Sequence, residues 1–428
     1  MGIKRLRSYL SGRFKTQSLE NFKGKCFGID GMSWLYKAFF SVNDDDHQLV
    51  KVPIVRRLEI KFRVLIEHGI RFVVVIDGRD LECKKETILE RKRKREGKSR
   101  AKGSDSEGED RAAGDQNVEE LAPRELDGET IDFFIDYLSF KGYDFIVAPY
   151  EADAQLLWLY KEKKVDFVVS EDSDFFAMSC FRVVSDVRKE GVAFVFDESV
   201  SSLKGNGDVW RRFWELSCPR RLLLCIMAGC DYVQNIRGVG FLTLLQFFYT
   251  RNSLKDSQFE TELANLIARR CRRGAEAFMQ QVRDAQATYT NQLVYNPDLE
   301  KLVPLTPPEA GCTPLPRHTG AFFSQGRAYA RGELDRATLK PRVPVDHNFP
   351  RLLGFVHFEQ KNAPPRLSNL CAEPFSFENF AHSKPHEDDD RKSHSSHAFS
   401  DETKLHSEGT LTKPSPIKIS RKIRKIKI

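Results

Sequence analysis

The sequence lacks a Cys-x-x-Cys pair and any apolar run that approaches the length of a membrane span. Its nine cysteines are scattered along the chain, which is typical of reduced, packed thiols in an intracellular protein. The first residues, Met1-Gly-Ile-Lys-Arg-Leu6, have no apolar signal core, and Leu6 stands where a myristoylation signal requires Ser or Thr. We therefore expect a soluble protein with no membrane partner.

A large excess of one charge is also missing, since 68 Lys and Arg residues stand against 61 Asp and Glu residues in a chain of 428. The location of the charge matters more than the net value of +7. Lys84–Lys102 has ten basic and three acidic residues, whereas Asp105–Glu129 has ten acidic and two basic ones. Residues 97–117 are nearly bare of apolar groups, so we expect a flexible insertion after a helix over 84–95.

Two strands are expected at Lys25–Asp30 and Arg71–Asp77, and each ends on an aspartate. Apolar, β-branched runs that alternate with helical runs are typical of a parallel sheet covered on both faces. Such sheets bind ligands at the carboxyl ends of their strands. The sequence therefore predicts an α/β fold with a mostly parallel central sheet flanked by helices.

The stretch Ala148–Cys180 holds two pairs of carboxylates. Glu151 and Asp153 begin a helical run, and Asp172 and Asp174 follow a strand-like run. Acids crowded at the edge of a buried sheet repel one another and lose hydration, so a cation or a proton must offset them. The first hypothesis is a divalent metal site.

Seven acids in all fall at element ends that an α/β sheet would bring to one edge. Carboxylates without accompanying His or Cys suit Mg²⁺ or Mn²⁺ rather than zinc, and two such ions can assist phosphodiester cleavage. A single Asp-x-Asp is more often a turn or a helix cap, so the hypothesis depends on the joint arrangement. The candidate metal ligands are Asp30, Asp77, Glu151, Asp153, Asp172, Asp174 and Asp231.

A second motif follows Asp231. A helix expected at Arg220–Met227, the turn Ile236-Arg-Gly-Val-Gly240 and a helix expected at Leu242–Tyr249 form a hairpin whose backbone amides can meet a phosphate. A lone Gly-x-Gly is equally compatible with an ordinary helix cap. Near the end, Lys413–Ile428 has seven basic residues and no acid, which indicates a nuclear-import signal, a DNA contact or plain disorder.

Together these motifs resemble the flap endonuclease and XPG family of structure-specific 5′ nucleases. The resemblance covers about residues 1–339 and implies a PIN-like 5′ nuclease core with a helical arch and a helix-two-turn-helix. It implies 5′ to 3′ exonuclease and flap endonuclease activity on duplex DNA ends, nicks, gaps and 5′ flaps, with two Mg²⁺ ions that Mn²⁺ can replace. The runs that carry it are Ile29-Asp-Gly-Met-Ser-Trp-Leu35, Val75-Ile-Asp-Gly78 ahead of Lys84-Lys-Glu86, Tyr150-Glu-Ala-Asp-Ala-Gln-Leu156, Glu171-Asp-Ser-Asp174, Gly229-Cys-Asp-Tyr232 and Asn291–Leu305.

The resemblance also implies roles for single residues. All seven acids match the metal ligands of the family, with the pair at 151 and 153 towards one ion and the pair at 172 and 174 towards the other. Lys84 and Arg91 match a pair of cations that reaches the scissile phosphate from the base of the arch. A cation there opposes the charge that develops in the transition state.

Further residues match DNA contacts of the family. Gly2, once Met1 is removed, matches an N-terminus close to the metals, and Lys85 lies beside the catalytic lysine. Tyr36 falls where the family places a ring against DNA, although Tyr36 and its aromatic neighbours could equally pack the helix. Gly238 and Gly240 match the hairpin that grips the duplex around a K⁺ ion.

Some positions depart from the family. The residues after Gly240, Phe241-Leu-Thr-Leu-Leu245, lack the expected Lys or Arg, so the grip on the duplex or its salt dependence is expected to be weaker. The acidic run would repel DNA if it faced the site, and it could gate access or carry phosphates on Ser104 and Ser106. None of these departures replaces a candidate metal ligand.

The expected organisation has five parts: 1–96 and 130–250 as nuclease regions, 97–129 as the arch insertion, 251–345 as the end of the core and 346–428 as a largely disordered tail. The basic tail favours the nucleus, and mismatch-repair proteins or a sliding clamp are possible partners. Three alternatives stay open: a flap endonuclease that prefers endonucleolytic cuts, a non-catalytic DNA-binding protein on a nuclease fold, and an acid-lined phosphatase. The basic arch and the hairpin disfavour the phosphatase.

Overall fold

The computed structural model describes most of the first 343 residues of the chain. Gly2, Lys85, Arg91, nearly all of the insertion expected at 97–129 and nearly all of the tail expected at 346–428 lie outside the described residues. Within the described ranges, no helix is both long and apolar enough to cross a lipid bilayer. The described residues are 3, 6–42, 51–81, 84, 126–197, 208–271, 274–307, 324–343 and 349.

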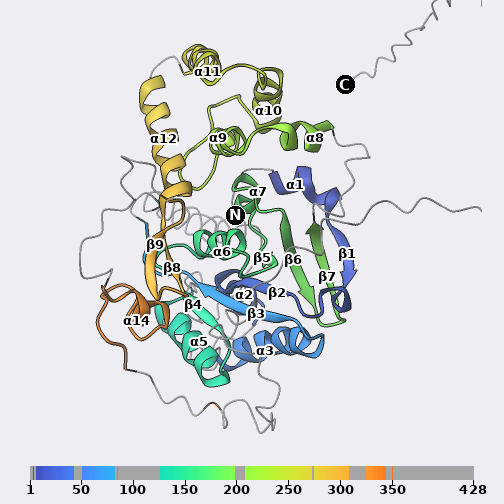
Figure 1. Cartoon of the computed structure of the whole chain (residues 1–428), viewed down its shortest axis with the longest axis vertical. Coiled ribbons are helices and arrows are strands. Elements are labelled where there is room, and N and C mark those ends of the chain that lie inside the picture. Colours follow the sequence, from blue (N-terminus) through green and yellow to red (C-terminus); the bar gives the residue numbers. More distant parts are fainter. Residues whose placement is uncertain are drawn as a thin grey trace, which may run out of the picture. The chain divides into compact units, whose positions relative to one another are not determined.

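A sheet of seven strands forms the centre of the fold (Figure 1). Its strands are β1 (Lys15–Ser18), β2 (Cys26–Asp30), β3 (Arg71–Ile76), β4 (Phe145–Val147), β5 (Phe167–Val169), β6 (Arg182–Arg188) and β7 (Val192–Asp197). Their order is β1-β7-β6-β5-β2-β3-β4, and the five strands from β6 to β4 are parallel. Strand β7 lies between β1, the edge strand, and β6, and it runs antiparallel to both. The predicted α/β fold with a mostly parallel sheet is confirmed.

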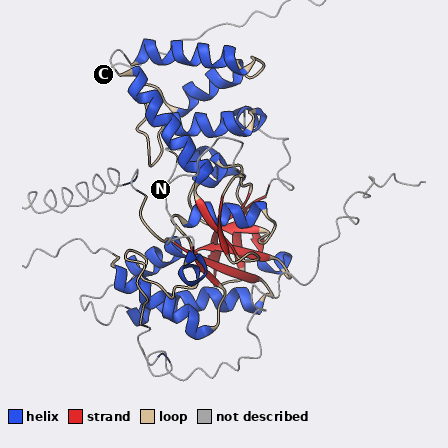
Figure 2. Ribbon diagram, turned by 60° about the vertical axis from the view of Figure 1, so that its left-hand side comes forward, coloured by secondary structure: helices blue, strands red, loops and turns tan. Residues whose placement is uncertain are grey.

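Helices cover both faces of this sheet (Figures 1 and 2). On one face, a Cβ added to Gly28 in β2 would lie 2.8 Å from Leu156, so the sheet and the helix α6 approach closely. On the other face, Phe72 of β3 stacks on Phe62 of α3 with ring centroids 5.2 Å apart. The helices packed on the sheet or on one another are α6 (Ala152–Lys161) on the face of Gly28, and α2 (Gly31–Phe40), α3 (Lys51–Glu67) and α5 (Gly128–Lys141).

Aspartates set where two of these helices begin. The side chain of Asp30, the last residue of β2, accepts a hydrogen bond from the backbone N–H of Ser33 and caps α2. Asp127 caps α5 in the same way through the N–H of Thr130. A cap satisfies a free amide of the first helical turn. Asp30 can therefore end β2 and start α2 with no loop between them.

A group of helices follows the sheet in the chain. Helix α10 packs on α8 and α9, and α12 packs on α9. Arg220 of α9 is buried and donates hydrogen bonds to the backbone oxygens of Asn252 and Leu254, so one cation closes the turn between α10 and α11. The helices are α8 (Asp208–Glu215), α9 (Cys218–Ala228), α10 (Phe241–Thr250), α11 (Asp256–Arg270) and α12 (Ala275–Asn291).

The remaining elements are short. The helix α1 and the 3₁₀ turn η1 precede β1, the 3₁₀ turn η2 lies between β1 and β2, and α7 follows β5. After α12, the hairpin of β8 and β9 packs on α6 and α14. Their bounds are α1 (Leu6–Leu10), η1 (Ser11–Arg13), η2 (Leu19–Phe22), α7 (Asp174–Ala177), β8 (Leu293–Asn296), β9 (Lys301–Pro304) and α14 (Gly326–Ala330).

Gly78, two residues beyond β3, tests how tightly this edge is packed. An added Cβ would collide with the backbone oxygen of Ala148 and lie 2.7 Å from the hydroxyl of Tyr329. We expect Gly78→Ala to lower the free energy of unfolding by about 3 kcal/mol, as overpacking against rigid backbone does. Urea unfolding measures the change. Gly12→Ala is the control, because nothing lies within 4 Å of its added Cβ, and equal midpoints for both variants would contradict the expectation.

Candidate metal centre

All seven acids singled out in the sequence lie where an element begins or ends. Two lie at the ends of parallel strands: Asp30 is the last residue of β2, and Asp77 comes directly after β3. The others stand at the start of α6, in the turn after β5, at the first residue of α7 and in the loop after α9. Electrostatic interactions link the seven into one group: Asp30, Asp77, Glu151, Asp153, Asp172, Asp174 and Asp231.

Backbone amides and a serine hold the acids nearest the strands. Asp30 accepts hydrogen bonds from the N–H of Ser33 at 2.9 Å and from the hydroxyl of Ser170 at 2.8 Å. Asp77 accepts one from the N–H of Ala152, the first residue of α6, at 2.7 Å. The elements that meet at this edge therefore fix the acids in place through their own backbone.

Asp174 ties distant parts of the chain to the same edge. One of its carboxylate oxygens accepts from the N–H of Ile3 at 2.9 Å, and the other accepts from the hydroxyl of Tyr289 in α12 at 2.7 Å. Asp172 accepts from the N–H of Asp174 at 3.0 Å. Ile3 lies at this edge, and its neighbour Gly2 is outside the described residues.

Lys84 lies among the acids. Its ammonium group forms an ion pair with Glu151 and lies 3.9 Å from a carboxylate oxygen of Asp231. Burial opposes the charge of Lys84, but Glu151, Asp153 and Asp231 outweigh burial and raise the pKa of the lysine above its usual value. Lys84 is therefore a charged counter-ion of the acid group, whereas Arg91 lies outside the described residues.

Glu151 has two further partners. Its second oxygen accepts from the hydroxyl of Tyr232 and from the side-chain amide of Gln292, the latter at 2.9 Å. Tyr232 follows Asp231 directly, and Gln292 follows α12. The ion pair and both hydrogen bonds fix the position of the Glu151 carboxylate.

The other carboxyl groups are harder to ionise. Burial raises the pKa of Asp30 from its usual 3.8 to about 7, against the hydrogen bonds from Ser33 and Ser170. Burial also raises the pKa of Asp77, Asp153, Asp172 and Asp174, and neighbouring acids add to the effect in each case. The edge therefore favours the approach of positive charge, whether as protons or as metal ions.

The donor chemistry of this edge fits a hard divalent cation such as Mg²⁺, which prefers carboxylate oxygens. Within the described ranges, no group of three or more His, Cys, Asp or Glu side chains could hold a metal ion as it stands. Lys84 forms an ion pair with Glu151. Oxygens of Asp30 and Asp174 already accept hydrogen bonds from amide and hydroxyl donors. Metal binding here requires carboxylates to turn and Lys84 to give up an ion pair.

The hairpin of α9 and α10 lies beside a separate pocket. Gly238 has a φ of +78°, a left-handed conformation that favours glycine, and Gly240 is the residue before α10. The pocket has a volume of about 530 Å³ and is lined by both glycines, Tyr9 and Thr243, among others. Its lining includes none of the seven acids, so the hairpin and the acid group form two separate sites.

The residues after Gly240 are apolar in the structure as in the sequence. Phe241 is buried and stacks on Tyr9 with ring centroids 5.3 Å apart, and Leu242 is 46% exposed. Arg237, just before the first glycine, is exposed. The hairpin therefore carries a cation before its two glycines in the sequence, whereas the resemblance to the family led us to expect one after them.

The aromatic side chains of α2 divide into two kinds. Trp34 and Phe39 are buried in the core. Tyr36 is only partly buried and stacks on Phe40, which is 54% exposed, with ring centroids 6.2 Å apart. Core packing therefore accounts for Trp34 and Phe39, and the ring pair of Tyr36 and Phe40 stands at the surface.

Sequence reasoning missed several polar residues at the acid group. Ser170 stands one residue before the motif Glu171-Asp-Ser-Asp174, and Tyr232 belongs to Gly229-Cys-Asp-Tyr232, so both could have been found by asking what satisfies the acids. Tyr289 lies 115 residues from its partner Asp174 and carries no local signal. The packing of α12 on α9 brings it there.

Comparisons with known proteins relate two regions of the chain to one family. The XPG N-terminal domain matches residues 1–98 and the XPG I-region matches residues 142–231, and together these regions hold all seven acids and Lys84. Exonuclease 1 of Oryza sativa subsp. japonica is 29% identical over 387 residues, which are 85% of this chain and 43% of that protein.

Exodeoxyribonuclease 1 of Schizosaccharomyces pombe is 29% identical over 345 residues, which are 76% of this chain and 54% of that protein. The chain thus spans about half the length of the curated relatives it matches. Among solved structures, the catalytic core of Rad2 in complex with DNA substrate is 20% identical with a TM-score of 0.46, over 82% of this chain and 93% of that chain.

The raised pKa of Asp30 predicts how stability depends on pH. Because the folded carboxyl titrates near 7 and the unfolded one near 3.8, the folded state holds the extra proton between these values. In EDTA, the free energy of unfolding should therefore fall as pH rises through this window, by on the order of a few kcal/mol. We expect Asp30→Asn, which mimics the protonated acid, to make this fall shallower in urea titrations at several pH values.

Asp335→Asn is the matched control for this prediction. Hydrogen bonds from Thr338 lower the pKa of Asp335, so its contribution to stability is present above its usual pKa and is lost as pH falls. Its removal should leave the decline towards neutral pH intact. An equally steep decline in Asp30→Asn and in the parent protein would contradict the role given to Asp30.

Proposed function

Because the chain belongs to the XPG family, we propose that it is a Mg²⁺-dependent, structure-specific 5′ to 3′ exonuclease with 5′ flap endonuclease activity on duplex DNA. The observation that carries the proposal is the group of seven buried or partly buried acids around Lys84 at one edge of the sheet. A non-catalytic DNA-binding protein would need no such costly arrangement of charge. We also propose the nucleus as its location and DNA repair or recombination as its role.

The acids of this chain would hold two Mg²⁺ ions, with Mn²⁺ as a substitute. When bound, such ions activate a water and stabilise charge on the leaving 3′ oxygen. In this proposal Glu151 and Asp153 serve one ion, and Asp172 and Asp174 serve the other. The hydrogen bonds from Ser170 and from the N–H of Ala152 keep Asp30 and Asp77 at this edge, and the carboxylates would turn there to take up the ions.

The chain's own cations would act on the phosphate. Lys84 already lies at the acid group, so the exchange of its partner Glu151 for the scissile phosphate would place a positive charge where negative charge develops. Arg91 would act with it. The position of Lys84 between Glu151 and Asp231 supports its part of this proposal.

Contacts to DNA would come from several elements. The hairpin at Gly238 and Gly240 would grip the duplex through backbone amides, with K⁺ bound there, and Tyr36 would stack on a base. Gly2 and Lys85 would contact DNA near the metals. We also propose the five-part organisation expected from the sequence, and mismatch-repair proteins or a sliding clamp as partners.

The central test is Asp172→Asn. Its amide oxygen can still accept from the N–H of Asp174, so the turn should persist while a negatively charged ligand is lost. We expect Mg²⁺-dependent cleavage of a 5′-recessed duplex to fall at least about a hundredfold, while duplex binding in Ca²⁺ persists. Single-turnover cleavage and fluorescence anisotropy measure the two quantities.

Asp186→Asn is the control for this test, because Asp186 of β6 pairs with Lys61 of α3 and is not one of the seven acids. It should cleave at the parent rate. Full activity in Asp172→Asn would rule out the proposed metal site.

The main alternative is a flap endonuclease that prefers endonucleolytic cuts. An end-labelled duplex distinguishes the two, because an exonuclease releases mononucleotides from a recessed end and a flap endonuclease releases oligonucleotides from a flap. The partly buried Tyr36 and the apolar Phe241 are compatible with exonuclease cleavage and with flap endonuclease cleavage alike.

A further inference from the structure

A closed turn over residues 334–342 lies beyond both regions matched by the family models. Leu334 and Pro341 form an isolated β-bridge, and the N–H of Asp335 donates to the backbone oxygen of Lys340 at 2.8 Å. The carboxylate of Asp335 accepts from the N–H and the hydroxyl of Thr338, both at 2.6 Å. These bonds make the turn a rigid platform for the side chains that it carries.

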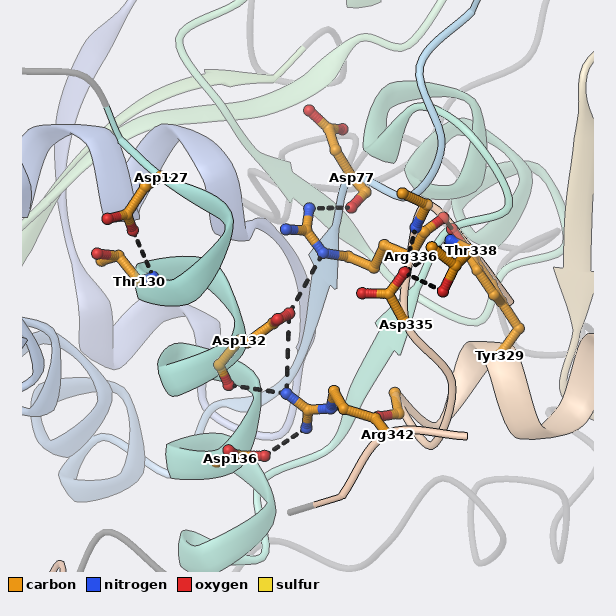
Figure 3. Close-up of polar contacts among 12 residues, drawn as sticks. Asp77, Asp127, Thr130, Asp132, Asp136, Tyr329, Asp335, Arg336, Thr338 and Arg342 are labelled. Atoms are coloured by element: carbon orange, nitrogen blue, oxygen red, sulfur yellow. Dashed lines mark hydrogen bonds and ion pairs between the residues drawn. The ribbon is translucent and has the colours of Figure 1, made fainter. Parts of the chain in front are cut away.

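Two arginines leave this turn towards the sheet and α5 (Figure 3). Arg336 donates to the backbone oxygen of Asp77 at 3.4 Å, and its Nε lies 3.5 Å from a carboxylate oxygen of Asp132 in α5. Arg342 donates to the backbone oxygen of Asp132 at 3.1 Å and pairs with Asp136. Both arginines hold α5, but Arg336 is the one that also contacts the acid after β3.

Tyr329 supports the same contact from the other side. It is fully buried, and its hydroxyl donates to the backbone oxygen of Arg336 at 3.2 Å. The same hydroxyl lies where it would meet a Cβ on Gly78, the residue after Asp77. Tyr329 and Arg336 therefore enclose the peptide between Asp77 and Gly78.

We propose that Arg336 is a positioning residue for the candidate metal centre, because it fixes the peptide of Asp77 while the N–H of Ala152 fixes the carboxylate. The inference rests on the proposed function for the identity of that centre. The planar guanidinium presents several donors in one fork, so it can bridge a carbonyl of the sheet edge and a carboxylate of α5 at once. A lysine at this position would lack the fork.

The test compares Arg336→Met with Asp136→Asn, which breaks the ion pair of Arg342 on the same helix and leaves Arg336 in place. In the full chain without DNA, we expect Arg336→Met to raise the Mn²⁺ concentration for half-saturation about tenfold, within the range seen when residues supporting metal ligands are lost. With Mg²⁺ and a 5′-recessed duplex, kcat should fall about tenfold while KM for DNA changes little. Asp136→Asn should lower the melting temperature but leave Mn²⁺ binding unchanged.

Titration of Mn²⁺ by electron paramagnetic resonance gives a readout that a purely structural role would not change. Equal weakening of Mn²⁺ binding in Arg336→Met and Asp136→Asn, or no weakening in Arg336→Met, would overturn the inference. If Arg336→Met does not fold, Tyr329→Phe decides in its place: weaker Mn²⁺ binding by about twofold or more supports the inference, and unchanged binding overturns it. Parent protein that binds Mn²⁺ but cuts no DNA would refute the proposed function alone.

Discussion

The mutual repulsion of carboxylates at the carboxyl edge of the parallel sheet is the constraint on which the rest of the structure depends. Burial alone raises the pKa of several of these acids, and each acid makes its neighbours harder to ionise. Fixed hydrogen-bond donors and one partly buried cation, Lys84, lie against these acids. These contacts offset part of the cost and leave a site that attracts further positive charge.

The compensating groups come from segments that are distant in sequence. Ile3 precedes the first helix, Tyr289 belongs to α12, and Arg336 lies in a turn beyond the hairpin of β8 and β9. Tyr289 reaches the acid group through the packing of α12 on α9. The segments that hold Tyr289 and Arg336, beyond the matched family regions, are therefore structural parts of the same site.

Much of the scaffold could be predicted from the sequence. The β-branched run Arg71–Ile76 is buried at nearly every position, and acids at strand ends must meet at one edge of a parallel sheet. Strand β1, Lys15–Ser18, escaped prediction because it is short, polar and largely exposed, so it carries no apolar alternation. The partners of the acids escaped for another reason: hydrogen bonds such as that of Tyr289 depend on tertiary packing that no local pattern records.

The dipeptide after β3 links the sequence motif to its physical cause. Both the carboxylate and the backbone carbonyl of Asp77 have fixed partners. The carboxylate lies among other acids, and the carbonyl lies at the edge of the sheet. Ala152 provides an N–H for the carboxylate, and Arg336 provides a guanidinium for the carbonyl. Gly78 must follow because any side chain would strike the backbone of Ala148 and the hydroxyl of Tyr329. The Asp-Gly pair thus reflects a shortage of space as well as a demand for charge.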